Sequence, residues 1–202
     1  LEPQKKFAEA LADVQEVLRL DPKHQKAYLL RAEIFYGRQE YSKFFEDIDT
    51  LLKLNPQSSD AYALRGGLQY LRKFEGDIQN ALVDYKEILR LFPESYGAWN
   101  ALATVQYMLG NQEEASFCIE RSIQGSAHLK VSYLTRAKIR AAQKDKEGAL
   151  ADMDQVVSLE PDNGADRYER GLVKMRFNLL DEALEDFNMA IEMKTGNAFI
   201  FL

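Results

Sequence analysis

The chain has few of the residues that build disulfide, metal or catalytic sites. Its 202 residues include one cysteine, Cys118, and two histidines, His24 and His128. A single cysteine excludes an intramolecular disulfide framework and fits a reducing compartment such as the cytoplasm. Each histidine precedes an expected helix and is interpreted as a solvated loop residue.

The sequence also contains no Cys/His cluster and none of the HExxH, GxGxxG or P-loop spacings. Cys118 lies between Phe117 and Ile119 on an expected helix, which favours a buried, inert thiol over a nucleophile. Acidic pairs such as Glu113-Glu114 open helices, where carboxylates favour the N-terminus, so they are not interpreted as metal ligands. We therefore expect no catalytic residue, no metal and no cofactor.

Long apolar runs and an excess of basic residues are absent as well. No apolar run approaches the length that spans a bilayer, so no membrane insertion is predicted, and no signal peptide is visible. The net charge is −6, with 26 basic residues dispersed among 32 acidic ones. Nucleic-acid binders need a basic stripe to neutralise phosphates, so a nucleic-acid partner is not expected.

Only five prolines and 11 glycines interrupt the chain, which favours helix. With 46% hydrophobic and 29% charged residues, the composition is that of a folded protein. Four of the prolines close a Leu-x-Pro sequence, where each stops a helix without costing an internal hydrogen bond. These endings are Leu20-Asp21-Pro22, Leu54-Asn55-Pro56, Leu91-Phe92-Pro93 and Leu159-Glu160-Pro161.

The endings recur with a period of roughly 34 residues, and the interval from Pro93 to Pro161 spans two units. Two further series, mostly of small residues, follow the same period. One comprises Ala10, Phe44, Ala81, Ala115, Ala149 and Ala183, and the other Ala32, Gly66, Ala103, Ala137 and Gly171. Small residues on facing helices allow close backbone approach, and a repeat of this period predicts stacked helix hairpins.

The expected organisation is a single array with units at about 1–22 (partial), 23–56, 57–93, 94–127, 128–161 and 162–195. Residues 196–202 would begin a further helix. The chain would open on a lone second helix from about Lys5 to Leu20, as expected for a fragment of a longer protein; degenerate terminal caps are the alternative. Three extra residues near Arg72–Asp77 predict a longer inter-helix loop, and Gly125-Ser126-Ala127 replaces one Leu-x-Pro ending.

The hairpin at Tyr96–Ala127 carries the pattern most completely, with Trp99, Leu102, Ala103, Gly110 and Ala115. With the Leu-x-Pro endings, these residues make the whole chain resemble the tetratricopeptide repeat family. The resemblance implies an all-α, right-handed superhelix of about six hairpins, whose first helices line a concave groove. It also implies that the groove binds a peptide or helix of another protein.

Arginine and aspartate recur together at one fixed spacing, once the insertion is allowed for. The pairs are Arg31 with Asp47, Arg65 with Asp84, Arg136 with Asp152 and Arg170 with Asp186. The remaining hairpin has Leu102 and Cys118 at these places, so both charges are present or both absent. This predicts a partly buried ion pair joining the two helices, since an unpaired buried charge is costly. A binding role for the arginines is the alternative.

By the resemblance, the groove-facing positions are mostly apolar and aromatic. They are Leu29, Tyr36, Tyr70, Leu71, Asn100, Tyr107, Met108, Leu134, Tyr168, Leu172 and Met175. Three tyrosines recur at equivalent places, and the core register is already occupied by Ala27, Tyr28 and Ile34. Such a surface suits an amphipathic helix or an extended apolar peptide, although a helical stripe of this kind can also be core.

Two binding modes known in the resembled family are not expected. The carboxylate clamp of Hsp70 and Hsp90 co-chaperones needs Lys, Asn and Arg, whereas this chain has Leu29, Glu33, Leu64, Gly97 and Ala101. The asparagine ladder of the O-linked sugar transferase is replaced by Leu30, Leu64, Ala101, Thr135 and Glu169.

We therefore expect a non-enzymatic interaction scaffold with a protein or peptide partner. One alternative is a structural or self-assembling module, which includes a homo-oligomer. Another is the targeting arm of an enzyme whose catalytic domain lies outside this sequence. The apolar Tyr96–Ala127 hairpin is the place where a bound partner is expected first.

Overall fold

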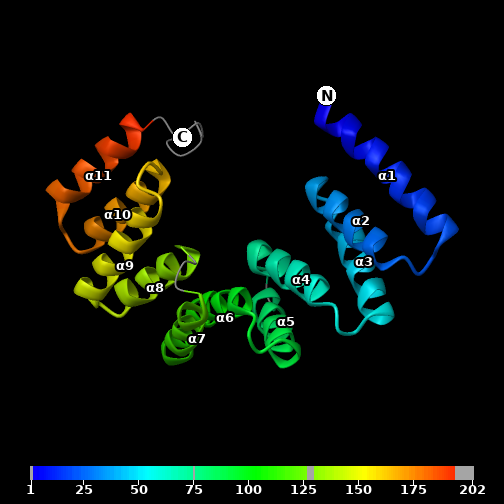
Figure 1. The fold of residues 1–202 in the computed structure, drawn as a ribbon, viewed down its shortest axis with the longest axis horizontal. Coiled ribbons are helices and arrows are strands. Elements are labelled where there is room, and N and C mark those ends of the chain that lie inside the picture. Colours follow the sequence, from blue (N-terminus) through cyan, green and yellow to red (C-terminus); the bar gives the residue numbers. More distant parts are fainter. Residues whose placement is uncertain (1, 75, 127–129, 194–202) are drawn as a thin grey trace. The chain divides into compact units, whose positions relative to one another are not determined.

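A computed structural model describes residues 2–74, 76–126 and 130–193, with side chains from Lys6 onward. Within these ranges the regular elements are eleven helices, and no strand is present. The helices are α1 (Glu2–Leu20), α2 (Gln25–Gly37), α3 (Tyr41–Leu54), α4 (Ser59–Arg72), α5 (Asp77–Leu91), α6 (Tyr96–Met108), α7 (Gln112–Gly125), α8 (Lys130–Ala142), α9 (Lys146–Leu159), α10 (Gly164–Arg176) and α11 (Leu180–Glu192) (Figure 1).

The chain forms two compact units, Leu1–Pro93 with α1 to α5 and Glu94–Leu202 with α6 to α11. In the first unit each helix packs against the next one along the chain. In the second unit α6 and α7, α8 and α9, and α10 and α11 form hairpins, and each later hairpin packs on the one before it. The helices therefore follow one another as antiparallel partners, each covering the apolar face of a neighbour.

The helices stop where the Leu-x-Pro endings predict. α3 ends at Leu54, two residues before Pro56, and the carbonyl of Pro56 accepts a hydrogen bond from the Tyr62 hydroxyl at 3.3 Å. The carbonyl of Pro22 accepts the same bond from Tyr28 at 3.1 Å. Proline therefore both ends one helix and anchors the start of the next.

Short polar side chains begin several helices by accepting a hydrogen bond from a free backbone N–H. Ser58 caps α4, Asp145 caps α9 and Asn163 caps α10 in this way. His24, interpreted from the sequence as a solvated loop residue, is exposed and also caps α2, because its Nδ1 accepts from Ala27 at 3.1 Å. His128 and residues 196–202, for which the sequence predicted a loop histidine and a further helix, lie outside the described residues.

Each described hairpin turn contains a residue in the left-handed backbone region at the equivalent place. These residues are Gln39, Lys73, Gly110, Lys144 and Asn178, with φ between 54° and 81°. Glycine adopts this conformation without steric cost, whereas Gln39 and Lys144 do so at a cost of about 1 kcal/mol each. The left-handed position is thus common to these repeats, although only one of them has glycine there, and the turn after α4 differs in having a second left-handed residue, Gly76.

The three extra residues of the second hairpin are shared among three segments. α4 has 14 residues and α5 has 15, compared with 13 and 14 in α2 and α3. The connection between them covers residues 73–76, one more than the connection at 38–40. The loop is longer, as predicted, but by one residue only.

The core of each unit lies between facing helices. In the first unit Ala32, Phe44, Ile48 and Leu51 are buried together, and in the second Ala137, Ala149 and Met153 are. The small first-helix residue is matched in size to its neighbour on the second helix. Ala32 and Ala137 share a core cluster with Ile48 and Met153, whereas glycine stands where the neighbour is aromatic, at Gly66 beside Tyr85 and Gly171 beside Phe187.

Candidate functional site

Four arginines join the two helices of their own hairpins through paired hydrogen bonds. Arg31 donates from Nε and Nη2 to Asp47 at 2.8 and 2.6 Å, and Arg170 donates likewise to Asp186 at 2.9 and 2.6 Å. Arg65 binds Asp84 at 3.0 and 2.8 Å. Arg136 binds Asp152 at 2.7 to 3.1 Å. All four aspartates are buried. Two parallel bonds to a buried carboxylate fix the register of the hairpin.

Three of these arginines also reach back to the preceding hairpin, a contact that the sequence analysis missed. Nη1 of Arg65 donates to Asp49 at 2.9 Å, and Nη1 of Arg170 donates to Asp154 at 2.8 Å. Arg136 binds Glu120 at 3.0 Å in the same way. Each acid precedes its arginine by the same interval along the chain, so the spacing was visible in the sequence. One guanidinium therefore links three helices.

Two of the aspartates are held by a second cation as well. Arg140 donates to Asp152 at 2.9 Å, and the Lys174 ammonium lies 2.8 Å from Asp186. Burial raises the pKa of a carboxyl, but the hydrogen bonds and charges of Arg170 and Lys174 outweigh it and lower the pKa of Asp186.

Asp84 has the opposite shift. Burial raises the pKa of Asp84 above its usual value, although Arg65 opposes the rise, and the nearby charge of Asp49 adds to it. Asp84 has one cationic partner among the described contacts, whereas Asp186 has two. Asp84 therefore has one cation fewer to oppose the effect of burial on its pKa.

The hairpin of α6 and α7 is held by apolar and neutral polar groups where the others use charge. Leu102 and Cys118 are both buried at the places of the Arg–Asp pair, and the thiol is not in a disulfide. Ser122, also buried, donates to the Tyr96 carbonyl and lies 2.8 Å from the Ser132 hydroxyl of α8. The ring of Trp99 meets Phe117 edge to face at 5.9 Å.

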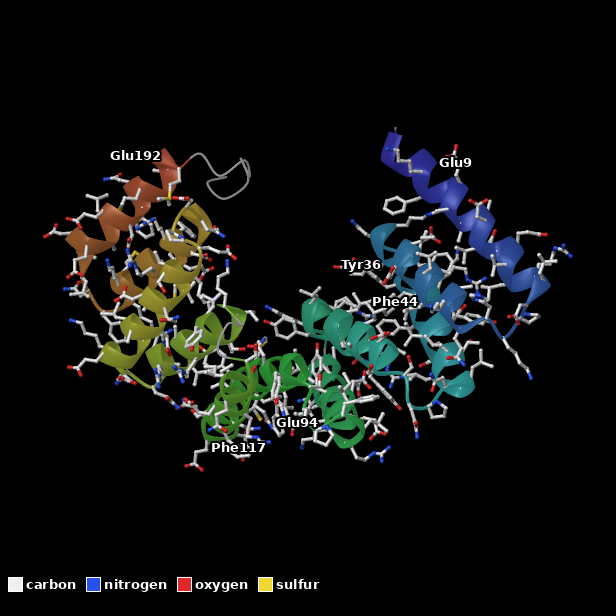
Figure 2. The ribbon with its side chains drawn as sticks, viewed as in Figure 1. Glu9, Tyr36, Phe44, Glu94, Phe117 and Glu192 are labelled. Atoms are coloured by element: carbon white, nitrogen blue, oxygen red, sulfur yellow. The ribbon has the colours of Figure 1, made fainter. Side chains whose placement is uncertain are left out.

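In the first unit, the predicted groove residues lie on α2 and α4. Tyr36 and Leu71 are 44% and 58% exposed. Leu29 is half-buried against the core, and Tyr70 is half-buried too. The ring of Tyr36 lies 6.4 Å from that of Phe44, near the end of α2 (Figure 2). Tyr36 and Leu71 are thus the members of this set available to a partner.

In the second unit, the predicted groove residues lie on α6, α8 and α10. Met108 and Met175 are 40% and 50% exposed. Leu134 packs half-buried on the core, and the Tyr168 ring lies 5.5 Å from that of Phe187. The half-buried residues of the set are Asn100, Tyr107, Leu134, Tyr168 and Leu172.

Asn100 is a predicted groove residue with a polar atom that is both buried and unpaired among the described side chains. Its Oδ1 is shielded from solvent and accepts no hydrogen bond. A buried oxygen without a donor is costly, so it marks a local imperfection in the packing of α6.

Within the described residues no group of three or more potential metal ligands is present, and no helix is both long and apolar enough to span a bilayer. The described side chains thus offer arginine–carboxylate clusters and exposed apolar positions on helices.

A family model described as tetratricopeptide repeat matches residues 4–59, 71–116 and 134–198. The chain belongs to the tetratricopeptide repeat family. The prediction of an all-α solenoid of helix hairpins is thereby confirmed. Proteins of this family are in general non-catalytic scaffolds for protein–protein interaction, and membership supports that general role for this chain.

Solved structures agree in fold. PilW, described as a type IV pilus biogenesis factor, is 18% identical with a TM-score of 0.78, over 92% of this chain and 84% of PilW. YrrB, a tetratricopeptide repeat protein with an unusual peptide-binding site, is 17% identical with a TM-score of 0.64, over 90% and 92%. A repeat protein from Parabacteroides merdae is 25% identical with a TM-score of 0.74, over 97% and 75%. No curated protein sequence matches.

Proposed function

We propose that this chain binds an apolar segment of a partner protein, in particular an amphipathic helix, on the exposed faces of its first helices. The observation that carries the proposal is the exposure of Tyr36, Leu71, Met108 and Met175, which occupy two adjacent places of the repeat. The core places of the same helices are filled by other residues, such as Ala32 and Ile34. These four are therefore not needed to close the core.

The chemistry of the exposed residues indicates the kind of partner. Methionine adapts to the shape of an apolar ligand, and tyrosine offers a rigid apolar ring with a polar edge. An amphipathic helix presents apolar anchors at i, i+3, i+4 and i+7 to such a surface. Among the solved relatives, YrrB is described as having a peptide-binding site.

The test is to pan a library of helical and extended peptides against the intact chain, and to measure the affinity of the selected peptides by calorimetry. We expect selected peptides to carry apolar residues at helical spacing. The double variant Tyr36→Ser, Leu71→Ser should weaken the binding of peptides that contact the first unit at least tenfold. The double variant Met108→Ser, Met175→Ser should have the same effect on peptides that contact the second unit.

The matched control is Val17→Ser on α1, which removes a side chain that is 39% exposed outside the proposed surface. The control should leave affinity unchanged, and none of these variants should lower the melting temperature by more than about 2 °C, because exposed positions contribute little to stability. Equal loss of binding in the control, or no selected peptide at all, would show the proposal to be wrong.

A role in assembly is favoured by one observation on α11. Leu184 and Ile191 are each 58% exposed, whereas their repeat equivalents Leu150 and Val157 are half-buried and buried. An apolar face of this kind suits another helix, including one from a second copy. Sedimentation velocity across a concentration series decides this: a homo-oligomer that dissociates in Leu184→Glu supports assembly, and a monomer at every concentration excludes self-association.

A further inference from the structure

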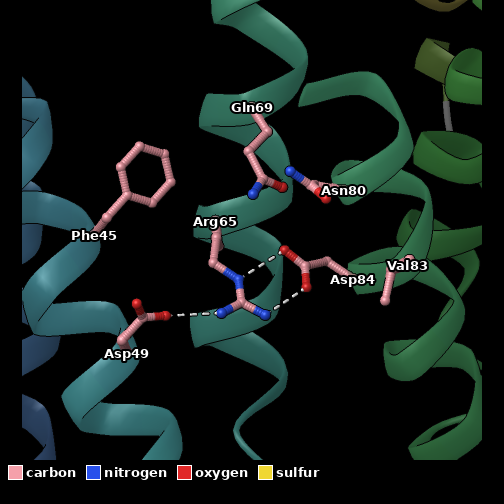
Figure 3. A pocket seen from close by; sticks show the side chains of 7 residues that line it. All are labelled: Phe45, Asp49, Arg65, Gln69, Asn80, Val83 and Asp84. Carbon is pink, nitrogen blue, oxygen red and sulfur yellow. Dashed lines mark hydrogen bonds and ion pairs between the residues drawn. The ribbon is translucent and has the colours of Figure 1, made fainter. Parts of the chain in front are cut away.

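A pocket of about 380 Å³ lies in the first unit among α3, α4 and α5. Phe45 and Val83 form apolar walls on either side, and Figure 3 shows Arg65 between two aspartates. The lining residues are Phe45, Asp49, Arg65, Gln69, Asn80, Val83 and Asp84. The pocket is not part of the first-helix surface proposed above.

Gln69 has an unpaired acceptor in this pocket. Its side chain is 8% exposed, and its Oε1 accepts no hydrogen bond. Gln106 occupies the equivalent place on α6 and is also buried, yet its Oε1 accepts from Nδ2 of Asn111 at 2.8 Å. The residue five places after Gln69 is Phe74, which offers no donor side chain. A buried carbonyl without a donor is costly, so the site favours a ligand that donates.

The charges of the pocket do not balance. Arg65 donates to Asp84 at 2.8 and 3.0 Å and to Asp49 at 2.9 Å, so one cation faces two anions. Arg72, a further charged group, lies over the Phe45 ring and forms an ion pair with Asp77 at 3.4 Å, so its charge is matched. Asp49 is the more exposed of the two aspartates and leaves the excess negative charge open to the pocket.

Two other hairpins show what fills the equivalent place. Gln69 follows Arg65 by four positions, as Arg140 follows Arg136 and Lys174 follows Arg170. Arg140 binds Asp152 at 2.9 Å, and its Nη2 lies 3.8 Å from Glu120. Lys174 lies 2.8 Å from Asp186. In both places a built-in cation reaches the aspartate that corresponds to Asp84.

We propose that the pocket among α3, α4 and α5 binds an alkylguanidinium or alkylammonium group, whose charged end takes the place that Arg140 and Lys174 fill in the later repeats. The charged end lies beside Asp84 and donates to Gln69 Oε1 and Asp49, and the alkyl stem lies between Phe45 and Val83. The same chemistry is offered by an arginine or lysine side chain of a protein and by a free amine such as a polyamine.

The test is a titration of the intact protein with n-butylguanidinium and n-butylammonium, followed by NMR of a sample labelled at the glutamine and asparagine side-chain amides. N-butylurea is the neutral control of the same shape. We expect saturable shifts of the Gln69 and Asn80 amides with either cation, and at least tenfold weaker binding of the urea. Blocked tripeptides with a central arginine, compared with free spermidine, distinguish the two sources of the cation.

Gln69→Lys copies the arrangement of Lys174 and provides the decisive variant. It should abolish cation binding and raise the melting temperature, because the built-in ammonium occupies the site. Should that variant fail to fold, Asp49→Asn removes an exposed charge instead and should weaken cation binding at least fivefold.

Equal binding of cation and urea, undiminished binding to either variant, or no saturable shift with either cation would overturn the proposal. In the last case the Asn80 amide closing on Gln69 in solution would explain the result. The result of this titration does not depend on whether the exposed faces of the first helices bind a peptide, because peptide binding is measured in a separate experiment.

Discussion

A Cβ atom added to Gly171 would lie 2.5 Å from Cε1 of Phe187. This is closer than two carbon atoms can approach without displacement, so the glycine on α10 and the aromatic ring on α11 require one another. The same relation, less tight at 3.3 Å, joins Gly66 to Tyr85 in the first unit.

Gly171→Ala should therefore destabilise the protein, even though alanine favours helix. Overpacking costs about 1–3 kcal/mol, and helix propensity returns about 1 kcal/mol, so we expect a net loss of about 1 kcal/mol in urea unfolding. Adding Phe187→Ile, which copies the Ala103 and Ile119 pair, should reduce that loss.

Gly97→Ala is the control, because a Cβ there meets nothing within 4 Å. It should be neutral or stabilising. A loss in Gly97→Ala as large as in Gly171→Ala would show that the contact with Phe187 is not the cause.

The ion pair of Arg31 and Asp47 offers a second test. Arg31→Leu leaves Asp47 buried without its partner, and breaking a buried pair in this way costs about 3 kcal/mol. The double variant with Asp47→Cys copies Leu102 and Cys118 and should recover most of the loss. Urea unfolding under reducing conditions measures both. A double variant no more stable than Arg31→Leu would show that an unpaired charge is not what destabilises the single one.

Lys174→Met should make the second unit more sensitive to acid. The pKa of Asp186 is lowered in the folded protein, so its stabilising contribution is present above the unfolded pKa and is lost as the pH falls through the folded value. Removing one cation raises the folded pKa, and the loss then begins at a higher pH. The measurement is the free energy of unfolding between pH 2 and 7 for both proteins. If the free energy of unfolding changes with pH in the same way for both proteins, Lys174 does not lower the pKa of Asp186.

Lys144→Gly should stabilise the turn between α8 and α9. Lys144 has a φ of 65°, and relieving a left-handed side chain gains about 1 kcal/mol, less the entropy that glycine adds to the unfolded chain. Gly110→Ala is the reciprocal change and should destabilise by a similar amount. Differential scanning calorimetry measures both. We expect a higher melting temperature for Lys144→Gly and a lower one for Gly110→Ala. A lower melting temperature for Lys144→Gly would show that the left-handed backbone of Lys144 does not destabilise the turn.

The regular features of this fold were predictable because they recur. The repeat period indicated the hairpins, and the Leu-x-Pro endings marked where α3, α5 and α9 stop. The fixed spacing between arginine and aspartate pointed to the partner of each arginine within its hairpin. The spacing from Arg65 back to Asp49 is equally regular. It links two hairpins, however, and the repeat pattern alone does not say which acid of a neighbouring hairpin an arginine meets.

Other features depend on what one repeat has and another lacks. The unpaired oxygen of Gln69 follows from the changed turn after α4, which leaves Phe74 where Asn111 stands in the next hairpin. The half-burial of Tyr70 and the exposure of Tyr36 differ although both occupy the same place in the repeat. Such differences arise from neighbouring side chains, and periodicity alone does not encode them.

The three-helix arginine link also bears on how such a chain can lengthen. The hairpin of α8 and α9 carries both groups of this link. Its Arg136 donates to an acid of the preceding hairpin, and its Asp154 accepts from an arginine of the following hairpin. A tandem copy of this segment would bring its own matching junction, so duplication needs no compensating substitution. In the sequence, Lys86 and Leu102 stand at the places of that acid and that arginine. Duplication of α8 and α9 would therefore keep the three-helix link at the new junction, whereas duplication of α6 and α7, with Leu102 at the arginine place, would not.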